Sequence, residues 1–216
     1  STSRGLGDVY KRQGIGCDQI LIVESPSRPD VDFRYRIFNN NGQEVEQCGN
    51  GARCFAKFVH NRKLTGKSNI LVETKNGIIK IRLLHDGLVQ VDMGAPELEP
   101  NKIPFDADKQ EILYKVPFEK SQILLSAISM GNPHAVLIVN DTASASVKLM
   151  GEVISKNSMF PKEANVGFMQ IINPSEINLR VYERGCGETL ACGSGACAAV
   201  VAGQLQGLLA VSYTHL

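Results

Sequence analysis

QCGNGAR at residues 47–53 and ACGSGAC at residues 191–197 are two copies of one short pattern, cysteine-glycine-polar-glycine-alanine. An apolar segment with helical composition follows each copy, and strands with a connecting loop precede it. The repetition predicts two similar α/β halves, each of which places a Cys-Gly-polar-Gly turn at the N-terminus of a helix.

Outward from the two copies, the pattern of apolar residues predicts strands and helices in both halves. FRYRIF at residues 33–38 has period two, so one face of this strand is apolar and the other carries Arg34 and Arg36. Strands are expected at residues 20–24, 33–38, 69–74, 78–84, 88–93, 122–129, 135–139, 166–172 and 177–183, and helices at residues 52–63, 144–157 and 196–208.

The division between the halves is expected where prolines gather. Residues 94–104 contain three prolines, a composition typical of a connection between domains. We therefore expect an N-terminal domain at residues 14–94 and a C-terminal domain at residues 95–210.

The two ends of the chain are related through their codons. One set of codons for residues 7–13 (GDVYKRQ) encodes VSYTHL, residues 211–216, when it is read on the opposite DNA strand. Two unrelated natural peptides have no reason to share this relation. Residues 1–13 and 211–216 are therefore expected to be non-native, adapter-derived tails, with both natural ends missing.

The composition excludes several classes of function. The 216 residues are 43% hydrophobic and 21% charged, which is typical of a globular protein, and no apolar run is long enough for a membrane span. A net charge of +1 and the absence of tryptophan argue against a nucleic-acid or membrane partner. Six cysteines are too few for a disulfide scaffold of this length, which favours the reducing cytoplasm.

The chemistry of the repeated turn follows from its place at a helix N-terminus. Backbone N–H groups and a partial positive charge bind a carboxylate or phosphate there, and the glycines let the ligand approach closely. The same field is expected to lower the pKa of the thiols of Cys48 and Cys192 toward neutrality. Two activated thiols favour two-base proton transfer, in which one thiolate removes a proton from carbon and the other thiol returns one to the opposite face.

The other four cysteines are expected to be packing residues. Cys54 lies on one stripe of its helix with Phe55, Phe58 and Val59, and Cys197 lies inside the second helix. Cys17 and Cys186 have no assigned chemistry.

Other kinds of site fit these residues less well. A structural disulfide is disfavoured in a reducing compartment, and no closely paired C-x-x-C ligands for zinc are present. Gly66-Lys67-Ser68 resembles the end of a P-loop, but Asn61 stands where the first glycine belongs. A non-catalytic module that holds a carboxylate at the two helix ends stays open as an alternative.

Five longer strings carry a resemblance to a known family. They read GIGCDQ (14–19), RIFNNNGQEVEQCGNGARCFA (36–56), SMGNPH (129–134), NVGF (165–168) and YERGCGETLACGSGACAA (182–199). With these motifs in this order, the chain closely resembles the bacterial diaminopimelate epimerases, isomerases that work without pyridoxal phosphate.

The resemblance implies a fold class, an activity and a setting. The fold is α/β (α+β), with two pseudo-symmetric domains that are each a largely antiparallel sheet wrapped around a central helix. The activity is conversion of LL- to meso-diaminopimelate, which serves lysine and peptidoglycan-precursor biosynthesis. The resemblance also implies no cofactor, no metal, a small-molecule substrate as partner, and a cytoplasmic homodimer.

The resemblance assigns roles where the motifs match. Cys48 and Cys192 are the acid/base pair, and His134 and Glu183 influence the pKa of the thiols. The substrate-binding residues that it implies are Gln19, Asn39, Gly49, Asn50, Asn132, Asn165, Glu183, Arg184, Gly193 and Ser194.

Two points separate this chain from a complete match. The family begins with a strand and a GLGND loop and continues past the second helix with further strands, so the fold of residues 14–210 is expected to be incomplete. A related two-cysteine racemase acting on proline or hydroxyproline is the alternative enzyme, although Arg184 and the asparagines favour a substrate with a second charged end.

Overall fold

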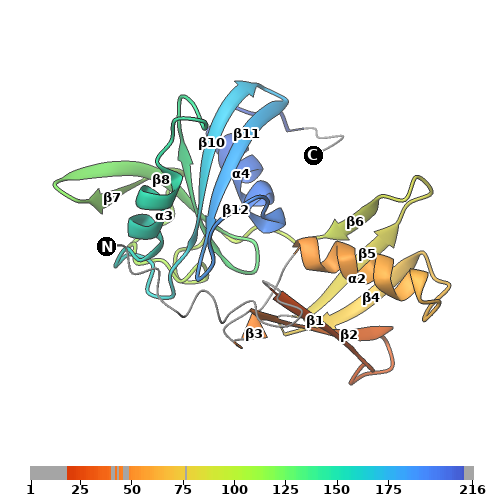
Figure 1. Ribbon diagram of the computed structural model, residues 1–216. Coiled ribbons are helices and arrows are strands. Elements are labelled where there is room, and N and C mark those ends of the chain that lie inside the picture. Colours follow the sequence, from red (N-terminus) through yellow and green to blue (C-terminus); the bar gives the residue numbers. More distant parts are fainter. Residues whose placement is uncertain (1–18, 40–41, 43, 46–48, 76, 212–216) are drawn as a thin grey trace, which may run out of the picture. The chain divides into compact units, whose positions relative to one another are not determined.

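The computed structural model describes residues 19–39, 42, 44–45, 49–75 and 77–211 (Figure 1). Cys17, Cys48, the whole N-terminal tail and residues 212–216 of the C-terminal tail lie outside the described residues. The chain divides into two units, Ser1–Asp92 and Met93–Leu216. Over the described residues each unit contains a six-stranded mixed sheet with helices packed on it, so the predicted α+β fold class is confirmed.

The first unit is a sheet with one long helix on its apolar face. Its strand order is β1-β2-β4-β5-β6, with β3 paired to β2, and β2 and β4 are parallel because α2 connects them. The elements are β1 (Gln19–Glu24), β2 (Phe33–Asn39), β3 (Glu44–Val45), α2 (Gly49–Asn61), β4 (Asn69–Thr74), β5 (Gly77–Leu83) and β6 (Val89–Asp92).

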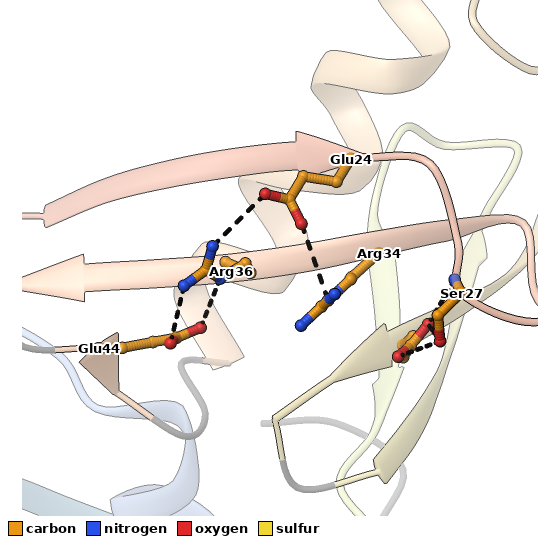
Figure 2. A network of polar contacts seen from close by, with 6 residues as sticks. Glu24, Ser27, Arg34, Arg36 and Glu44 are labelled. Carbon is orange, nitrogen blue, oxygen red and sulfur yellow. Dashed lines mark hydrogen bonds and ion pairs between the residues drawn. The ribbon is translucent and has the colours of Figure 1, made fainter.

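Strand β2 shows the predicted alternation. Tyr35 and Ile37 are buried beneath α2, and the Tyr35 ring lies 5.2 Å from that of Phe55. Arg34 and Arg36 occupy the other face, where both reach the carboxylate of Glu24 (Figure 2). The period-two pattern therefore separates an apolar core face from a charged face.

Helix α2 is rotated relative to the predicted stripe. Its buried residues include Ala52, Phe55, Ala56 and Val59, which follow the i, i+3, i+4, i+7 spacing of a helix on a sheet. Cys54 is exposed and Phe58 is 46% exposed, so the prediction that Cys54 is a buried packing residue is wrong. A choice between overlapping stripes requires the sheet, which the local sequence does not contain.

The second unit is a sheet with a helix on each face. Its strand order is β12-β11-β10-β9-β8-β7, and β9 and β10 are parallel with α3 between them in the chain. The elements are β7 (Tyr114–Phe118), β8 (Ser121–Ser129), β9 (Pro133–Ile138), α3 (Val147–Ser155), β10 (Asn165–Asn173), β11 (Glu176–Glu183), β12 (Gly187–Thr189) and α4 (Gly193–Leu205). Strands β3, β7 and β12 were not predicted.

Alternate residues of the central strands build two separate cores. Val166 and Phe168 of β10 pack with α3, whereas Met169 packs with the small residues of α4. Helix α3 lies so close to β11 that a Cβ atom at Gly151 would stand 2.5 Å from the Cβ of Tyr182. This contact fixes the end of β11, where Glu183 and Arg184 follow.

Among the described residues, every helix is too short or too polar to cross a membrane.

Candidate functional site

Cys192 stands directly before the first residue of α4. Its backbone is extended (φ −131°, ψ 111°), and its carbonyl accepts a hydrogen bond of 2.9 Å from the N–H of Ala196, the first bond of the helix. The N–H groups of the first helical residues, Gly193–Gly195, have no carbonyl partner within the helix. The predicted arrangement of a thiol beside a helix N-terminus is therefore present in the second unit.

The helix approaches the thiol closely because residue 195 is glycine. A Cβ atom at Gly195 would lie 3.2 Å from the Cβ of Cys192 and 3.4 Å from its Sγ, tighter than ordinary packing. The Cys192 Sγ also lies 3.5 Å from the Oγ of Ser194, whose side chain is buried. The second glycine of the turn thus brings backbone N–H groups against the sulfur.

The expectation that this helix end lowers the pKa of Cys192 is wrong. Burial of the thiol, followed by repulsion from the Glu183 carboxylate, raises its pKa to about 12. The Ser194 hydroxyl and the Gly195 N–H act in the opposite direction but are outweighed. The Cys192 side chain therefore carries its proton at neutral pH.

Glu183 is the charged neighbour of this thiol. It is the last residue of β11, and its Oε1 accepts a hydrogen bond of 2.5 Å from the Thr189 hydroxyl. Strand β12 brings Thr189 there, because Val181 and Thr189 are paired across the two strands. Thr189 was not predicted from the sequence, because a strand of three residues is too short to give a periodic signal.

The effect of Glu183 predicts how the thiol responds to alkylation. Glu183→Gln removes the repulsion, so the pKa of Cys192 should fall and its rate of alkylation at pH 8 should rise about threefold to tenfold. In the wild type the rate should climb with pH without a plateau up to pH 10, because the thiolate fraction grows until the pKa of about 12. Peptide mass spectrometry of iodoacetamide-treated protein measures both, and an unchanged rate in the variant would contradict the assignment.

A second group of predicted residues lies where the central strands β9 and β10 of the same sheet begin. His134 is the second residue of β9, and the parallel register pairs it with Asn165, the first residue of β10. The His134 Nε2 lies 3.0 Å from the Oδ1 of Asn132. Burial, with the positive charge of Arg184, lowers the pKa of His134 to about 3, so its ring is neutral at neutral pH.

Asn165 and Arg184 are held by backbone contacts. The Asn165 Oδ1 accepts a bond of 3.0 Å from the backbone N–H of Arg184, and its Nδ2 donates to the carbonyl of Pro133 at 3.3 Å. The Arg184 Nη1 donates to the carbonyl of Lys162 at 2.8 Å. Asn165 therefore ties together the starts of β9 and β10 and the end of β11.

The predicted substrate-binding residues of the first unit lie on β1 and β2 and at the start of α2. The antiparallel register places Gln19 directly opposite Asn39. Gly49 and Asn50 are the first residues of α2, and the Asn50 Oδ1 accepts a hydrogen bond from Arg53. Helix α2 thus begins at the same point of the repeat as α4.

Two of the remaining cysteines differ in their environment. Cys186 is exposed, so the expectation that it is a packing residue is wrong; it lies in the turn between β11 and β12. Cys197 is half-buried against the α4 side of the sheet, where burial raises its pKa.

Solved structures with the same architecture show which fold the chain has. A hydroxyproline epimerase from Agrobacterium vitis with bound trans-4-hydroxy-L-proline superposes with a TM-score of 0.66 at 14% identity, over 95% of this chain and 67% of that one. A phenazine biosynthesis protein of the PhzF family from Bacillus anthracis superposes with a TM-score of 0.60 at 17% identity, over 96% and 73%. The chain therefore shares the fold of this hydroxyproline epimerase and this PhzF-family protein.

Sequence comparison identifies the family. The sequence pattern of the diaminopimelate epimerases matches residues 9–99 and 126–215. The diaminopimelate epimerase of Teredinibacter turnerae is 56% identical over 207 residues, 96% of this chain and 74% of that protein, and that of Thioalkalivibrio sulfidiphilus is 57% identical over 201 residues, 93% and 72%. The chain belongs to the diaminopimelate epimerase family, as the motifs predicted.

Proposed function

We propose that this protein converts LL-diaminopimelate to meso-diaminopimelate without a cofactor, by moving a proton at one α-carbon between two thiols. The observation that carries the proposal is Cys192 at the N-terminus of α4, with the Glu183 carboxylate beside it. Relatives that are about 56% identical over most of the chain bear the name of this activity.

The protonation state of Cys192 suggests how the two thiols divide the work. With a pKa of about 12, Cys192 holds its proton and is the donor, while Cys48 as thiolate removes the α-proton of the substrate. The α C–H bond breaks to the sulfur of Cys48, and a new C–H bond forms on the opposite face with the proton from Cys192. After one turnover Cys48 carries the proton and Cys192 is a thiolate, and proton exchange with water returns both thiols to their starting states before the next turnover.

The carboxylate beside the reacting carbon needs donors for the charge that develops in the transition state. The N–H groups of Gly193 and Ser194 at the positive end of α4 are suited to this, because they bind an anion without side-chain reorganisation. We assign Gly49 and Asn50 the same role in the first unit, and Gln19 and Asn39 a role in substrate binding. Asn132, Asn165 and Arg184 are proposed to recognise the distal amino-acid end.

The proposal is tested by incubating the protein with LL-diaminopimelate in D₂O. Chiral chromatography with mass spectrometry should show the meso product carrying one solvent deuterium at the inverted carbon. L-Proline and trans-4-hydroxy-L-proline serve as parallel substrates. Deuterium uptake on proline but not on diaminopimelate would contradict the proposal and favour the related racemase.

The proposed setting of the enzyme is the cytoplasm, where thiols stay reduced. We also propose that the protein is a homodimer, which light scattering coupled to size-exclusion chromatography measures directly.

A further inference from the structure

The two thiol-bearing turns belong to a longer repeat that the side-chain contacts reveal. An arginine stands twelve residues before each repeated cysteine, and a glutamate stands four residues before it. These residues are Arg36 and Glu44 in the first copy, and Arg180 and Glu188 in the second. Each arginine lies on a long strand, β2 or β11, and each glutamate lies on the short strand, β3 or β12, that pairs with it.

Both copies make the same contacts. In the first unit the Arg36 Nε and Nη2 lie 2.8 and 3.0 Å from the carboxylate oxygens of Glu44 (Figure 2). In the second unit the Arg180 Nε and Nη2 lie 2.8 and 2.6 Å from the Oε1 of Glu188. A spacing of eight residues and the same two guanidinium nitrogens therefore recur in two units that are far apart in the sequence.

The third nitrogen of each guanidinium reaches a neighbouring element. The Arg36 Nη1 lies 3.6 Å from the carboxylate of Glu24 on β1. The Arg180 Nη1 donates to the carbonyls of Thr142 at 2.7 Å and Ala145 at 3.2 Å, in the loop before α3. Each arginine thus connects its short strand to a further part of the same unit.

The short strands need such a connection because their own pairing is minimal. Strand β3 pairs with β2 at only two positions and β12 with β11 at three, among the described residues. Ladders of this length are marginal without further contacts. In the second unit β12 also carries Thr189, next to Glu188. The Thr189 hydroxyl donates a hydrogen bond to the Glu183 carboxylate.

We propose that Arg36–Glu44 and Arg180–Glu188 are matched pairs that hold the short strand before each repeated turn, and that Arg180–Glu188 thereby sets the placement of Cys192. The inference rests on the proposed function, because it takes Cys192 as a proton-transferring group. All four side chains are between 26% and 34% exposed, so each pair contributes little to global stability. Each pair instead acts on the short strand that carries its glutamate.

A crossed alkylation experiment tests the proposal. Glu44→Gln and Glu188→Gln keep the side-chain size and remove the ion pair. We expect Glu188→Gln to raise the iodoacetamide rate of Cys192 about fivefold and to leave Cys48 within about twofold, because a loosened β12 exposes the thiol. Glu44→Gln breaks the matching pair of the first unit and should leave the rate of Cys192 within about twofold.

Two exposed ion pairs supply matched controls. Asp30→Asn removes the partner of Arg28 in the first unit, and Glu152→Gln removes the partner of Lys156 in the second. Neither control should alter either thiol by more than about twofold. An unchanged Cys192 rate in Glu188→Gln, or equal changes of Cys48 and Cys192 in that variant, would overturn the proposal.

A kinetic measurement separates positioning from binding. In Glu188→Gln kcat should fall about tenfold while KM stays within about twofold, because a misplaced Cys192 thiol slows proton transfer without removing a substrate contact. A rise in KM with unchanged kcat would overturn the proposal. The alkylation rates do not depend on turnover, so they decide this proposal even if the proposed epimerisation fails.

Discussion

Replacing either Cys192 or Cys48 with alanine is expected to abolish epimerisation, lowering kcat by more than about a thousandfold. Each face of the α-carbon needs its own proton carrier, and an alanine supplies none. In the second unit the lost carrier is the thiol at the N-terminus of α4. The measurement is the rate of deuterium incorporation into meso-diaminopimelate.

The control for these variants is Cys54→Ala. Cys54 is exposed on α2, so its replacement should leave both turnover and thermal stability close to those of the wild type. Circular dichroism melts of all three variants separate lost chemistry from lost structure. A folded Cys192→Ala protein with near-normal turnover would show that Cys192 is not a proton carrier.

The position of the thiol was predictable from the sequence, whereas its protonation state was not. C-G-x-G-A before an apolar segment correctly places Cys192 at the N-terminus of a helix, because the glycines permit a turn there and the segment that follows has helical composition. The pKa depends on burial and on Glu183, nine residues away in the sequence. The local sequence indicates that a helix N-terminus lies beside the thiol, which by itself would lower its pKa. It does not indicate the burial of the thiol, which raises the pKa by more.

The same distinction applies to the fold. Period two on β2 correctly separated the arginines from the buried Tyr35 and Ile37, because alternation is a local property of a strand. Of the stripe predicted for α2, Phe55 and Val59 are buried against the sheet but Cys54 and Phe58 are exposed, and β12 was not predicted, because both features depend on partners that are distant in the chain. The roles of the substrate-binding residues came from the family resemblance, and they stay predictions.

Arg184 is the residue on which recognition of the second charged end of the substrate can be tested. One of its nitrogens, Nη1, is bound to the carbonyl of Lys162, and its charge acts on the buried His134 beside Asn132. A guanidinium can keep such an anchor and still present further N–H groups to a carboxylate, whereas a lysine ammonium has a single nitrogen for both tasks.

Arg184→Lys is therefore expected to lower kcat/KM for diaminopimelate about a hundredfold, which corresponds to roughly 2–3 kcal/mol for one charge-assisted contact. Lysine, which is diaminopimelate without the distal carboxylate, is the comparison substrate, and its slow α-proton exchange in D₂O should change little. The matched control is Arg28→Lys, because Arg28 makes an exposed ion pair with Asp30 and its replacement should cost at most about 1 kcal/mol. If the variant keeps the wild-type preference for diaminopimelate over lysine, Arg184 does not read the distal carboxylate, and the specificity for a two-ended substrate must come from Asn132, Asn165 or the first unit.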